Sequence, residues 1–453
     1  MSPENDGQKG PMTRLFRRFR PFFVYAGLFS LCINLLMLVP SLYMLQVFDR
    51  VIASRSNETL VMLTLATIVA LAMMALLDAL RARLLAAAGL AMDATLGPRV
   101  LDGLLTDAAR AGGSEHTHGL RDVATLRGFF TGNGVFALFD APWLPIYVLI
   151  IFFFHPLLGA IALAGAIGLV ALVVVNERLA RAGLEKLATG TRQSTRDVDA
   201  SLRNAEVVAA MGMLPALTRR WVTQNAAVEQ HQLESSRLAA RMNGITKFAR
   251  QFIQTAMLCA GAYLVIDQNV SGGVMMAATI ILGRALSPVE MLIGSWRGLV
   301  DARGAWARLD AILRRRQHRE RNTALPKPSG QLSAERLVFA IPGAEKAIVK
   351  GVSFELQAGE SMGLIGPSAS GKSTLLRLLL GVWPPYAGTV RLDGADIASW
   401  PRSRLGKYIG YLPQDVELFS GTVAENIARL GEPEPQQVIA AAQRANAHEM
   451  ILR

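Results

Sequence analysis

Cysteine is almost missing from this 453-residue chain, which has only Cys32 and Cys259. Each of the two lies within an apolar segment, where a thiol behaves as a small hydrophobic side chain. Two isolated cysteines supply neither a disulfide framework nor a metal cluster. This scarcity excludes disulfide-stapled small domains and cysteine-based metal modules.

Charged residues are also few, at 18%, whereas hydrophobic residues make up 51% and the mean hydropathy is +0.31. Such a composition is more apolar than that of ordinary soluble domains, so lipid must solvate part of the chain. The net charge is nevertheless +12, with an isoelectric point near 10.1. A basic excess suits either nucleic acid or the positive-inside bias of membrane proteins. Because the arginines cluster beside long apolar segments, we favour the membrane interpretation and expect no nucleic-acid partner.

Six apolar segments are long enough to cross a bilayer core of about 30 Å. They cover approximately residues 22–45, 59–80, 134–154, 157–175, 248–266 and 274–293. The first follows a basic tail, as the apolar region of a signal peptide does. It is too long for one, lacks a small-residue cleavage site and precedes further spans. We therefore expect six transmembrane helices, with a tight reversal at His155 and Pro156 between the third and the fourth.

The basic residues indicate the orientation of these spans. Arginines are frequent in the long polar stretches that follow the second and fourth spans, for example Arg178, Arg192 and Arg219 in the later one. The loop at 267–273, by contrast, has no lysine or arginine. By the positive-inside rule, the long stretches and both termini lie in the cytoplasm. The sequence thus predicts a multi-pass membrane protein.

Composition changes along the chain predict four regions. They are a cytoplasmic N-terminal tail at 1–21, a transmembrane domain at 22–310, a linker at 311–330 and a soluble domain at 331–453. The linker ends in a run of proline, serine and glycine at 326–330. Short β-rich runs at 347–356 and 361–365 then precede a helical segment after Gly371, as expected of an α/β domain.

One motif in the soluble domain carries chemistry. Its residues are Gly366, Pro367, Ser368, Ala369, Ser370, Gly371, Lys372, Ser373 and Thr374, which fit the Walker A pattern G-x-x-x-x-G-K-[ST]. Glycines let the backbone curl so that successive N–H groups point at phosphate oxygens, and the following helix adds its positive dipole end. Lys372 would neutralise the β- and γ-phosphates of ATP, and the Ser373 hydroxyl would bind Mg²⁺. The alternative is a chance match in a glycine-rich turn, which the expected strand before the motif and helix after it argue against.

The position of this motif in the chain indicates which process ATP hydrolysis would drive. An ATPase domain that follows six membrane spans is expected to couple hydrolysis to transport across that membrane. A membrane-bound protein kinase would use a different glycine-rich loop and a distant strand lysine, and its other signatures do not occur in the sequence.

Downstream of the motif, two segments resemble the Q-loop region of ABC exporter ATPases. They are Tyr411–Asp415 and Leu418–Ile427. In that family the glutamine corresponding to Gln414 reaches the Mg²⁺ and the attacking water and also touches the membrane domain. The resemblance therefore implies catalytic roles for Lys372 and Gln414 and a metal-binding role for Ser373 and Gln414. A polar residue in a surface loop is the alternative for Gln414.

The membrane half resembles type I secretion permease/ATPases of the alkaline-protease exporter kind. The segments that carry this likeness are Leu42–Val51, Asp140–Pro145, Leu202–Val207, Ala210–Met213 and Gly283–Glu290. The resemblance implies an α-helical polytopic membrane domain of the ABC exporter type followed by a partial α/β P-loop NTPase domain. It also implies a homodimer in the lipid of a bacterial inner (plasma) membrane. This dimer would join a periplasmic membrane-fusion protein and an outer-membrane channel and export a secreted polypeptide. No peptidase-like domain precedes the first span, so leader cleavage is not implied.

The chain departs from the family in two respects. Ile341 stands where the family stacks an aromatic residue on adenine, and Phe339 is the nearest substitute on the same face of the strand. No signature motif, Walker B strand or switch histidine follows Gln414, and Arg453 ends the chain within helical sequence. We therefore expect a C-terminally truncated chain that binds nucleotide but does not hydrolyse it alone.

Three further features have open roles. Asp140 lies beside an apolar segment and either lines the substrate path or pairs near the interface. Segments 104–115 and 207–213 either couple the membrane domain to the ATPase or simply pack as cytoplasmic helix. At the level of the whole chain, the alternatives to polypeptide export are an exporter of lipid or drug and a non-hydrolysing, nucleotide-binding membrane protein.

Overall fold

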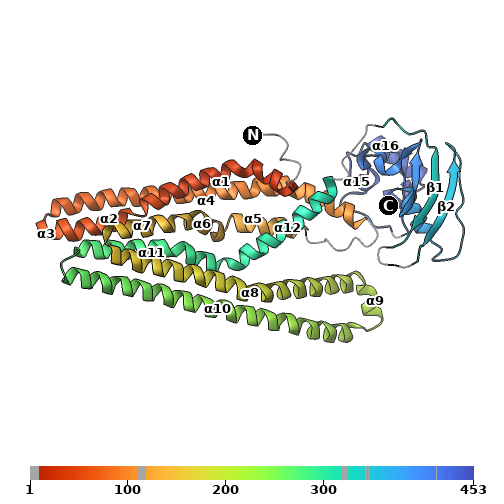
Figure 1. Ribbon diagram of the computed structural model, residues 1–453. Helices are drawn as coiled ribbons and strands as arrows, with labels where there is room; N and C mark the ends of the chain where they lie inside the picture. Colours follow the sequence, from red (N-terminus) through yellow and green to blue (C-terminus); the bar gives the residue numbers. More distant parts are fainter. Residues whose placement is uncertain (1–9, 110–118, 318–324, 342–343, 345, 415) are drawn as a thin grey trace. The chain divides into compact units, whose positions relative to one another are not determined.

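The computed structural model describes residues 10–109, 119–317, 325–341, 344, 346–414 and 416–453 (Figure 1). The chain divides into two compact units, 1–320 and 321–453. Parts of several predicted segments lie outside the described residues. They are 1–9 of the N-terminal tail, 110–115 of one coupling segment, 318–324 of the linker, Pro342 after the expected adenine-stacking position, and Asp415 beside Gln414.

The first unit is built from helices. They are α1 (Pro11–Leu36), α2 (Val39–Gln46), the π-helix η2 (Val47–Val51), α3 (Ile52–Ser54), α4 (Asn57–Ala108), α5 (Gly119–Phe130), α6 (Asn133–Asp140), the 3-10 helix η4 (Ala141–Trp143), α7 (Leu144–Phe154), α8 (Pro156–Arg203), α9 (Ala205–Ala210), α10 (Leu214–Ile266), α11 (Gly272–Gly294) and α12 (Trp296–Gln317). The longest, α4, α8 and α10, extend well beyond the apolar segments that they contain.

Within the described residues, five helical stretches are long and apolar enough to cross a membrane. They are Pro11–Ser54, Asn57–Ala108, Gly134–Phe154, Pro156–Arg203 and Gly272–Gly294. They contain five of the six apolar segments predicted from the sequence. The sixth, at 248–266, is helical as the C-terminal part of α10, but it is not among the five stretches. Arg250, Gln251 and Gln254 make its first turns polar, so composition alone does not support a count of six.

Local capping interactions explain where several of these helices begin. The Ser56 hydroxyl accepts the Thr59 N–H at 3.3 Å and starts α4, and the Ser271 hydroxyl accepts the Val274 N–H at 3.2 Å and starts α11. At His155 the backbone is extended, and its ring nitrogen Nδ1 accepts the Leu157 N–H at 3.1 Å. The predicted reversal between the third and fourth spans is thus found where Pro156 opens α8.

Two apolar clusters hold the helices together. One joins α7, α8, α10 and α11 through fully buried side chains that include Ile151, Leu169, Met257 and Leu282. The other joins α1, α4, α5 and α12 through Met12, Leu96, Leu126 and Leu309. Figure 1 shows α8 and α10 running side by side along most of their length. The apolar segments predicted from the sequence thus pack against one another as well as offering a face to lipid.

The second unit contains a four-stranded antiparallel sheet in the order β2-β1-β3-β4. Its strands are β1 (Leu332–Phe339), β2 (Val349–Leu356), β3 (Ala387–Leu392) and β4 (Ala395–Asp396). Leu332 of β1 lies opposite Leu356 of β2 on one side and Leu392 of β3 on the other. The helices of this unit are α13 (Lys372–Leu379), the 3-10 helix η5 (Ile397–Ser399), α14 (Arg402–Leu405), α15 (Val423–Ile427), α16 (Pro435–Arg444) and α17 (His448–Leu452).

The prediction for the two β-rich runs is half correct. Residues 347–356 contain β2, but residues 361–365 form no strand in the described sheet and are exposed, Ile365 to 93%. A strand exists only where its N–H and C=O groups pair with a neighbour. No described strand lies beside 361–365, so their apolar composition alone does not produce one.

Candidate functional site

The loop at 366–371 has the backbone shape that its glycines permit. Gly366, Ala369 and Gly371 have positive φ angles of 157°, 64° and 94°. A Cβ atom on Gly371 would lie 3.1 Å from Ile348 Cγ2, and one on Gly366 would lie 3.1 Å from Ser370 Oγ. Glycine is therefore favoured at both positions by conformation and by space. Ala369 adopts the left-handed region at some conformational cost, a feature common in functional loops.

The N-terminus of α13 opens directly from this loop. Gly371 is the residue before the helix, and no described side chain caps its first turn. Leu375 N–H donates to Gly371 O at 2.8 Å, and the buried Leu375 and Leu378 anchor the helix to the unit. The first-turn N–H groups and the positive end of the helix dipole are thus left for an external anion.

Lys372 folds back over the loop. Its Nζ donates to the carbonyl oxygens of Gly366 at 2.8 Å and Pro367 at 2.7 Å. The ammonium group therefore lies among the loop residues, where a phosphate oxygen could replace either carbonyl as a charged acceptor. The curled loop, the uncapped helix start, the ammonium group and the adjacent Ser373 hydroxyl together fit a polyphosphate with a divalent cation. The predicted residues Gly366–Thr374 are thus assembled in one loop and its following helix.

Gln414 lies on a separate exposed segment of the same unit. Before the segment, Arg429 Nη1 donates to Gly406 O at 2.6 Å and to Ile409 O at 3.3 Å. After it, Asn426 Oδ1 accepts the Phe419 N–H at 2.8 Å and Asn426 Nδ2 donates to Phe419 O at 2.9 Å. These contacts hold both ends of the segment while the Gln414 side chain is exposed to solvent.

A capping box fixes α15 immediately after this segment. The Glu425 carboxylate accepts the Thr422 N–H at 2.7 Å, and the Thr422 hydroxyl accepts the Glu425 N–H at 3.2 Å. The Thr422 backbone N–H, and after it the Thr422 hydroxyl, hold the pKa of Glu425 below its ordinary value. Both groups favour the ionised carboxylate because they donate to it.

The two candidates for adenine stacking differ in exposure. Phe339 is only 5% exposed and stacks on Trp383, with ring centroids 5.2 Å apart, while the Arg377 guanidinium lies 4.7 Å over the Trp383 ring. Phe339 is thus occupied inside the unit and does not offer a face to a base in this arrangement. Ile341 is 43% exposed but has no aromatic ring. Trp383 was not predicted from the sequence, because its stacking on Phe339 joins residues far apart in the chain.

Asp140 forms a buried ion pair. Its Oδ1 accepts from Arg81 Nη1 at 3.1 Å and from Asn34 Nδ2 at 2.9 Å, and Arg81 Nη1 also donates to Ser30 Oγ at 2.7 Å. The Tyr147 hydroxyl continues the network by donating to Asn34 Oδ1 at 2.9 Å. The structure therefore supports the pairing interpretation of Asp140 over a place in an open path. Arg81, which lies just after the second apolar segment, was not identified from the sequence as this partner.

The segment predicted for coupling at 207–213 forms the end of α9 and the turn into α10. Its apolar side chains are exposed, with Val207 at 50%, Met211 at 71% and Met213 at 40%. Of the other segment, residues 104–108 form the end of α4. A coupling role for either one stays a prediction.

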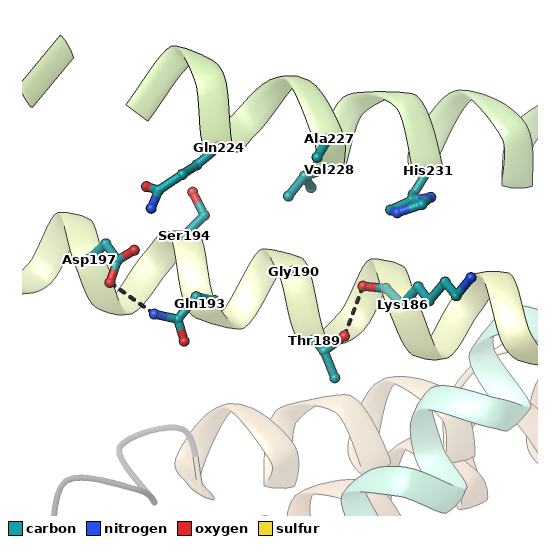
Figure 2. A pocket seen from close by; sticks show the side chains of 10 residues that line it. All are labelled: Lys186, Thr189, Gly190, Gln193, Ser194, Asp197, Gln224, Ala227, Val228 and His231. Carbon is teal, nitrogen blue, oxygen red and sulfur yellow. Dashed lines mark hydrogen bonds between the residues drawn. The ribbon is translucent and has the colours of Figure 1, made fainter. Parts of the chain in front are cut away.

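A hollow of about 450 Å³ lies between the polar extensions of α8 and α10 (Figure 2). Gly190 and Val228 mark the close approach of the two helices, since a Cβ on Gly190 would lie 3.1 Å from Val228 Cγ2. The Gln193 amide donates to Asp197 one turn later on the same helix, at 3.0 Å. The hollow is thus a space between two helices and contains no residue of the predicted nucleotide site.

Comparisons with known proteins agree with this arrangement. The family described as the ABC transporter transmembrane region matches residues 23–286, and the family described as ABC transporter matches residues 349–452. The type I secretion system ATP-binding protein PrsD of Rhizobium meliloti (strain 1021) is 39% identical over 449 residues, which are 99% of this chain and 77% of PrsD. The leukotoxin export ATP-binding protein LtxB of Aggregatibacter actinomycetemcomitans is 26% identical, over 96% of this chain and 62% of LtxB.

A solved structure shows the same fold at lower sequence similarity. It is described as a bacterial Atm1-family ABC exporter with ATP bound. The match covers 96% of this chain and 78% of the exporter chain, with a TM-score of 0.80 and 21% sequence identity. The chain thus spans between 62% and 77% of the length of the two curated relatives. On the family matches and the likeness to PrsD, the chain belongs to the ABC transporter family, with a helical membrane domain followed by an ATP-binding domain.

Proposed function

We propose that this protein is the inner-membrane component of an ATP-driven type I exporter of polypeptides. The observation that carries the proposal is the combination, in one chain, of helical stretches able to cross a membrane, five of them in the described part, and a loop shaped for polyphosphate. Support for the polypeptide substrate comes from the names of its relatives, which are a type I secretion protein and a leukotoxin export protein.

In the ATP-binding unit, residues 366–374 hold the phosphates of Mg-ATP. Lys372 moves from the Gly366 and Pro367 carbonyls to the β- and γ-phosphates, and Ser373 binds Mg²⁺. Gln414, on its exposed segment, would help to hold the metal and to orient the attacking water when Mg-ATP is bound. ATP supplies the free energy of phosphoryl transfer. The protein positions the reacting groups and stabilises the charge that develops on the phosphate.

In the membrane the protein works as a homodimer with both termini in the cytoplasm. A periplasmic membrane-fusion protein and an outer-membrane channel continue the path of the secreted polypeptide. The family likeness supports these partners, as it supports the homodimer.

Binding of nucleotide tests the first half of the proposal. The 453-residue chain is purified in detergent and titrated with Mg-ATP, and phosphate release is measured in the same samples. We expect Lys372→Ala to weaken binding at least about tenfold, because it removes a charge-assisted contact to phosphate. Lys350→Ala is the matched control, since Lys350 is an exposed lysine of β2. Equal binding by the wild type and the Lys372→Ala variant would contradict the proposed site.

Secretion tests the second half. A strain without the gene is compared with strains that carry the wild type or Lys372→Ala, and the polypeptides in the culture medium are identified by mass spectrometry. We expect at least one secreted polypeptide to disappear, and to return with the wild type only. An unchanged set of secreted polypeptides together with altered lipid or drug efflux would overturn polypeptide export.

A further inference from the structure

A cavity with several polar side chains lies between α10 and α11, in the first unit. Its volume is about 330 Å³, and its lining residues are Arg250, Gln254, Thr279, Ile280, Gly283, Arg284 and Ser287. Only Ile280 among them is a large apolar residue. Five of the seven lining side chains carry a charge, an amide or a hydroxyl, in a region where apolar side chains are the rule.

The cavity lies at membrane depth. Arg284 is twelve residues from the first residue of α11, Gly272, which corresponds to about 18 Å along the helix. Arg250 is sixteen residues before the last residue of α10, Ile266, or about 24 Å. Measured along their helices from these ends, both arginines are closer than the thickness of a hydrocarbon core, which is about 30 Å.

Its charges do not cancel. Arg250 forms an ion pair with Glu290 on α11. Arg284 is exposed, and no acidic side chain pairs with it among the described residues. The two arginines of the lining thus share one carboxylate partner, the Glu290 paired with Arg250, and the excess positive charge belongs to Arg284. An unpaired cation at this depth is stable only where water or an anionic group solvates it.

The packing of α11 keeps this space open. The opposite face of the helix, with Ala278, Ile281 and Ala285, is buried in the apolar cluster against its neighbours. On the cavity side, a Cβ atom on Gly283 would lie 2.7 Å from Gln254 Nε2, so any side chain there would push into the cavity. The polar face of α11 therefore turns away from the core, toward a wet space.

We propose that Arg284, with Arg250 and Gln254 beside it, binds carboxylate side chains of the exported polypeptide. The proposal rests on polypeptide export and names a contact for that substrate. Arg284 supplies the charge, while Gln254, Thr279 and Ser287 supply hydrogen-bonding groups for a peptide backbone.

Peptide binding tests this contact. The full chain is placed in nanodiscs of phosphatidylcholine, and the fluorescence anisotropy of two short labelled peptides is followed. One peptide is rich in Asp and Glu, and the other has Asn and Gln at the same positions. We expect the acidic peptide to bind the wild type at least about tenfold more tightly, as a charge-assisted contact predicts.

Substitutions of Arg284 test whether this residue causes the preference for the acidic peptide. Arg284→Gln should remove most of the preference for the acidic peptide, and Arg284→Lys should keep most of it, because the charge remains. Arg121→Gln is the control, since Arg121 is an exposed arginine of α5 outside the cavity. Mg-ATP binding is measured on every variant to verify that the chain is folded.

Three results would overturn the proposal, each in its own way. Equal binding of both peptides by the wild type would leave polypeptide export standing and remove the carboxylate contact. No binding of either peptide would count against polypeptide export itself. A preference for phosphatidylglycerol over phosphatidylcholine that depends on Arg284, without selectivity for the acidic peptide, would make the cavity a lipid site.

Discussion

Single residues of the phosphate-binding loop are fixed by conformation as much as by chemistry. Gly371 combines a φ of 94° with the close approach of Ile348, and no residue with a Cβ satisfies both without strain. The sequence motif predicts these residues because a P-loop is local, with its glycines, lysine and serine adjacent along the chain. The same locality explains why Lys372 is found over the loop, on the carbonyls of Gly366 and Pro367.

Gly371→Ala should therefore weaken the site through the backbone. We expect a loss of about 1–3 kcal/mol for a non-glycine residue in this conformation, together with weaker Mg-ATP binding. Gly363→Ala is the matched control, because a Cβ atom there would meet nothing within 4 Å and its φ is not positive. Thermal unfolding and nucleotide titration of both variants measure the difference. Equal effects of the two substitutions would show that the left-handed backbone at Gly371 is unimportant.

The buried pair between Arg81 and Asp140 shows what local patterns do not predict. The two residues are 59 positions apart, and their side chains are 5% and 8% exposed. Nothing in the sequence near Asp140 indicates which cation would meet it. The partner follows only from the packing of α4 against α1 and α6, which brings Ser30 and Asn34 into the same network.

Breaking this pair should destabilise the membrane unit strongly. Asp140→Asn removes the buried carboxylate from Arg81 and leaves it only the exposed Asp78, which Arg81 Nη2 contacts at 2.8 Å, so we expect a cost of about 1–3 kcal/mol. The double variant Arg81→Met with Asp140→Leu should be less destabilised than Asp140→Asn, because no charge stays buried. Thermal unfolding in detergent measures both, with Arg83→Met, an exposed arginine of α4, as control. If the unfolding temperature of the double variant is well below that of Asp140→Asn, the network contributes more to stability than charge balance.

Among the elements, α-helices were more predictable from the sequence than strands and than the π-helix. Apolar segments with a basic flank predict a spanning helix by themselves, and five such helices are present among the described residues. Residues 361–365 have strand composition, yet a strand depends on a partner elsewhere in the chain, so composition was not sufficient. The π-helix at Val47–Val51 had no signal either, although it positions Asp49 to accept the Ser271 hydroxyl at 2.6 Å and the Gly273 N–H at 3.0 Å.

The capping box of α15 makes one element sensitive to pH. The folded-state pKa of Glu425 is depressed, so its contribution to stability is present above the unfolded pKa and is lost as the pH falls through the folded pKa. Glu425→Gln should therefore loosen α15 and the segment after Gln414 at neutral pH, and the difference from the wild type should vanish in acid. Hydrogen exchange of residues 418–427, corrected for the intrinsic rate at each pH, measures this. The exposed Glu432→Gln serves as control; a Glu425→Gln effect that persists unchanged at low pH would exclude the carboxylate as its source.

At the scale of the whole molecule, the orientation in the membrane is the prediction with the widest consequences. Within the helical unit, α3 and the turn between α10 and α11 lie at the same end (Figure 1), and the contacts of Asp49 with Ser271 and Gly273 join them. Gly273 fits this contact because a Cβ there would lie 2.5 Å from Asp49 Oδ1. The loops near Arg55 and Gln268 must therefore face the same side of the membrane. Charge decides which side, since the loop at 267–273 has no lysine or arginine.

Cysteine labelling in intact cells tests that assignment. The native Cys32 and Cys259 are replaced by alanine, and single cysteines are placed at Gln268 or Gly330. An impermeant maleimide should label Gln268→Cys in intact cells with a permeable outer membrane, because the positive-inside rule puts that loop outside. Gly330→Cys should react only after the inner membrane is opened, since the ATP-binding unit must meet cytoplasmic ATP. Labelling of Gly330→Cys with protection of Gln268→Cys would reverse the orientation, and the proposed direction of transport would fail with it.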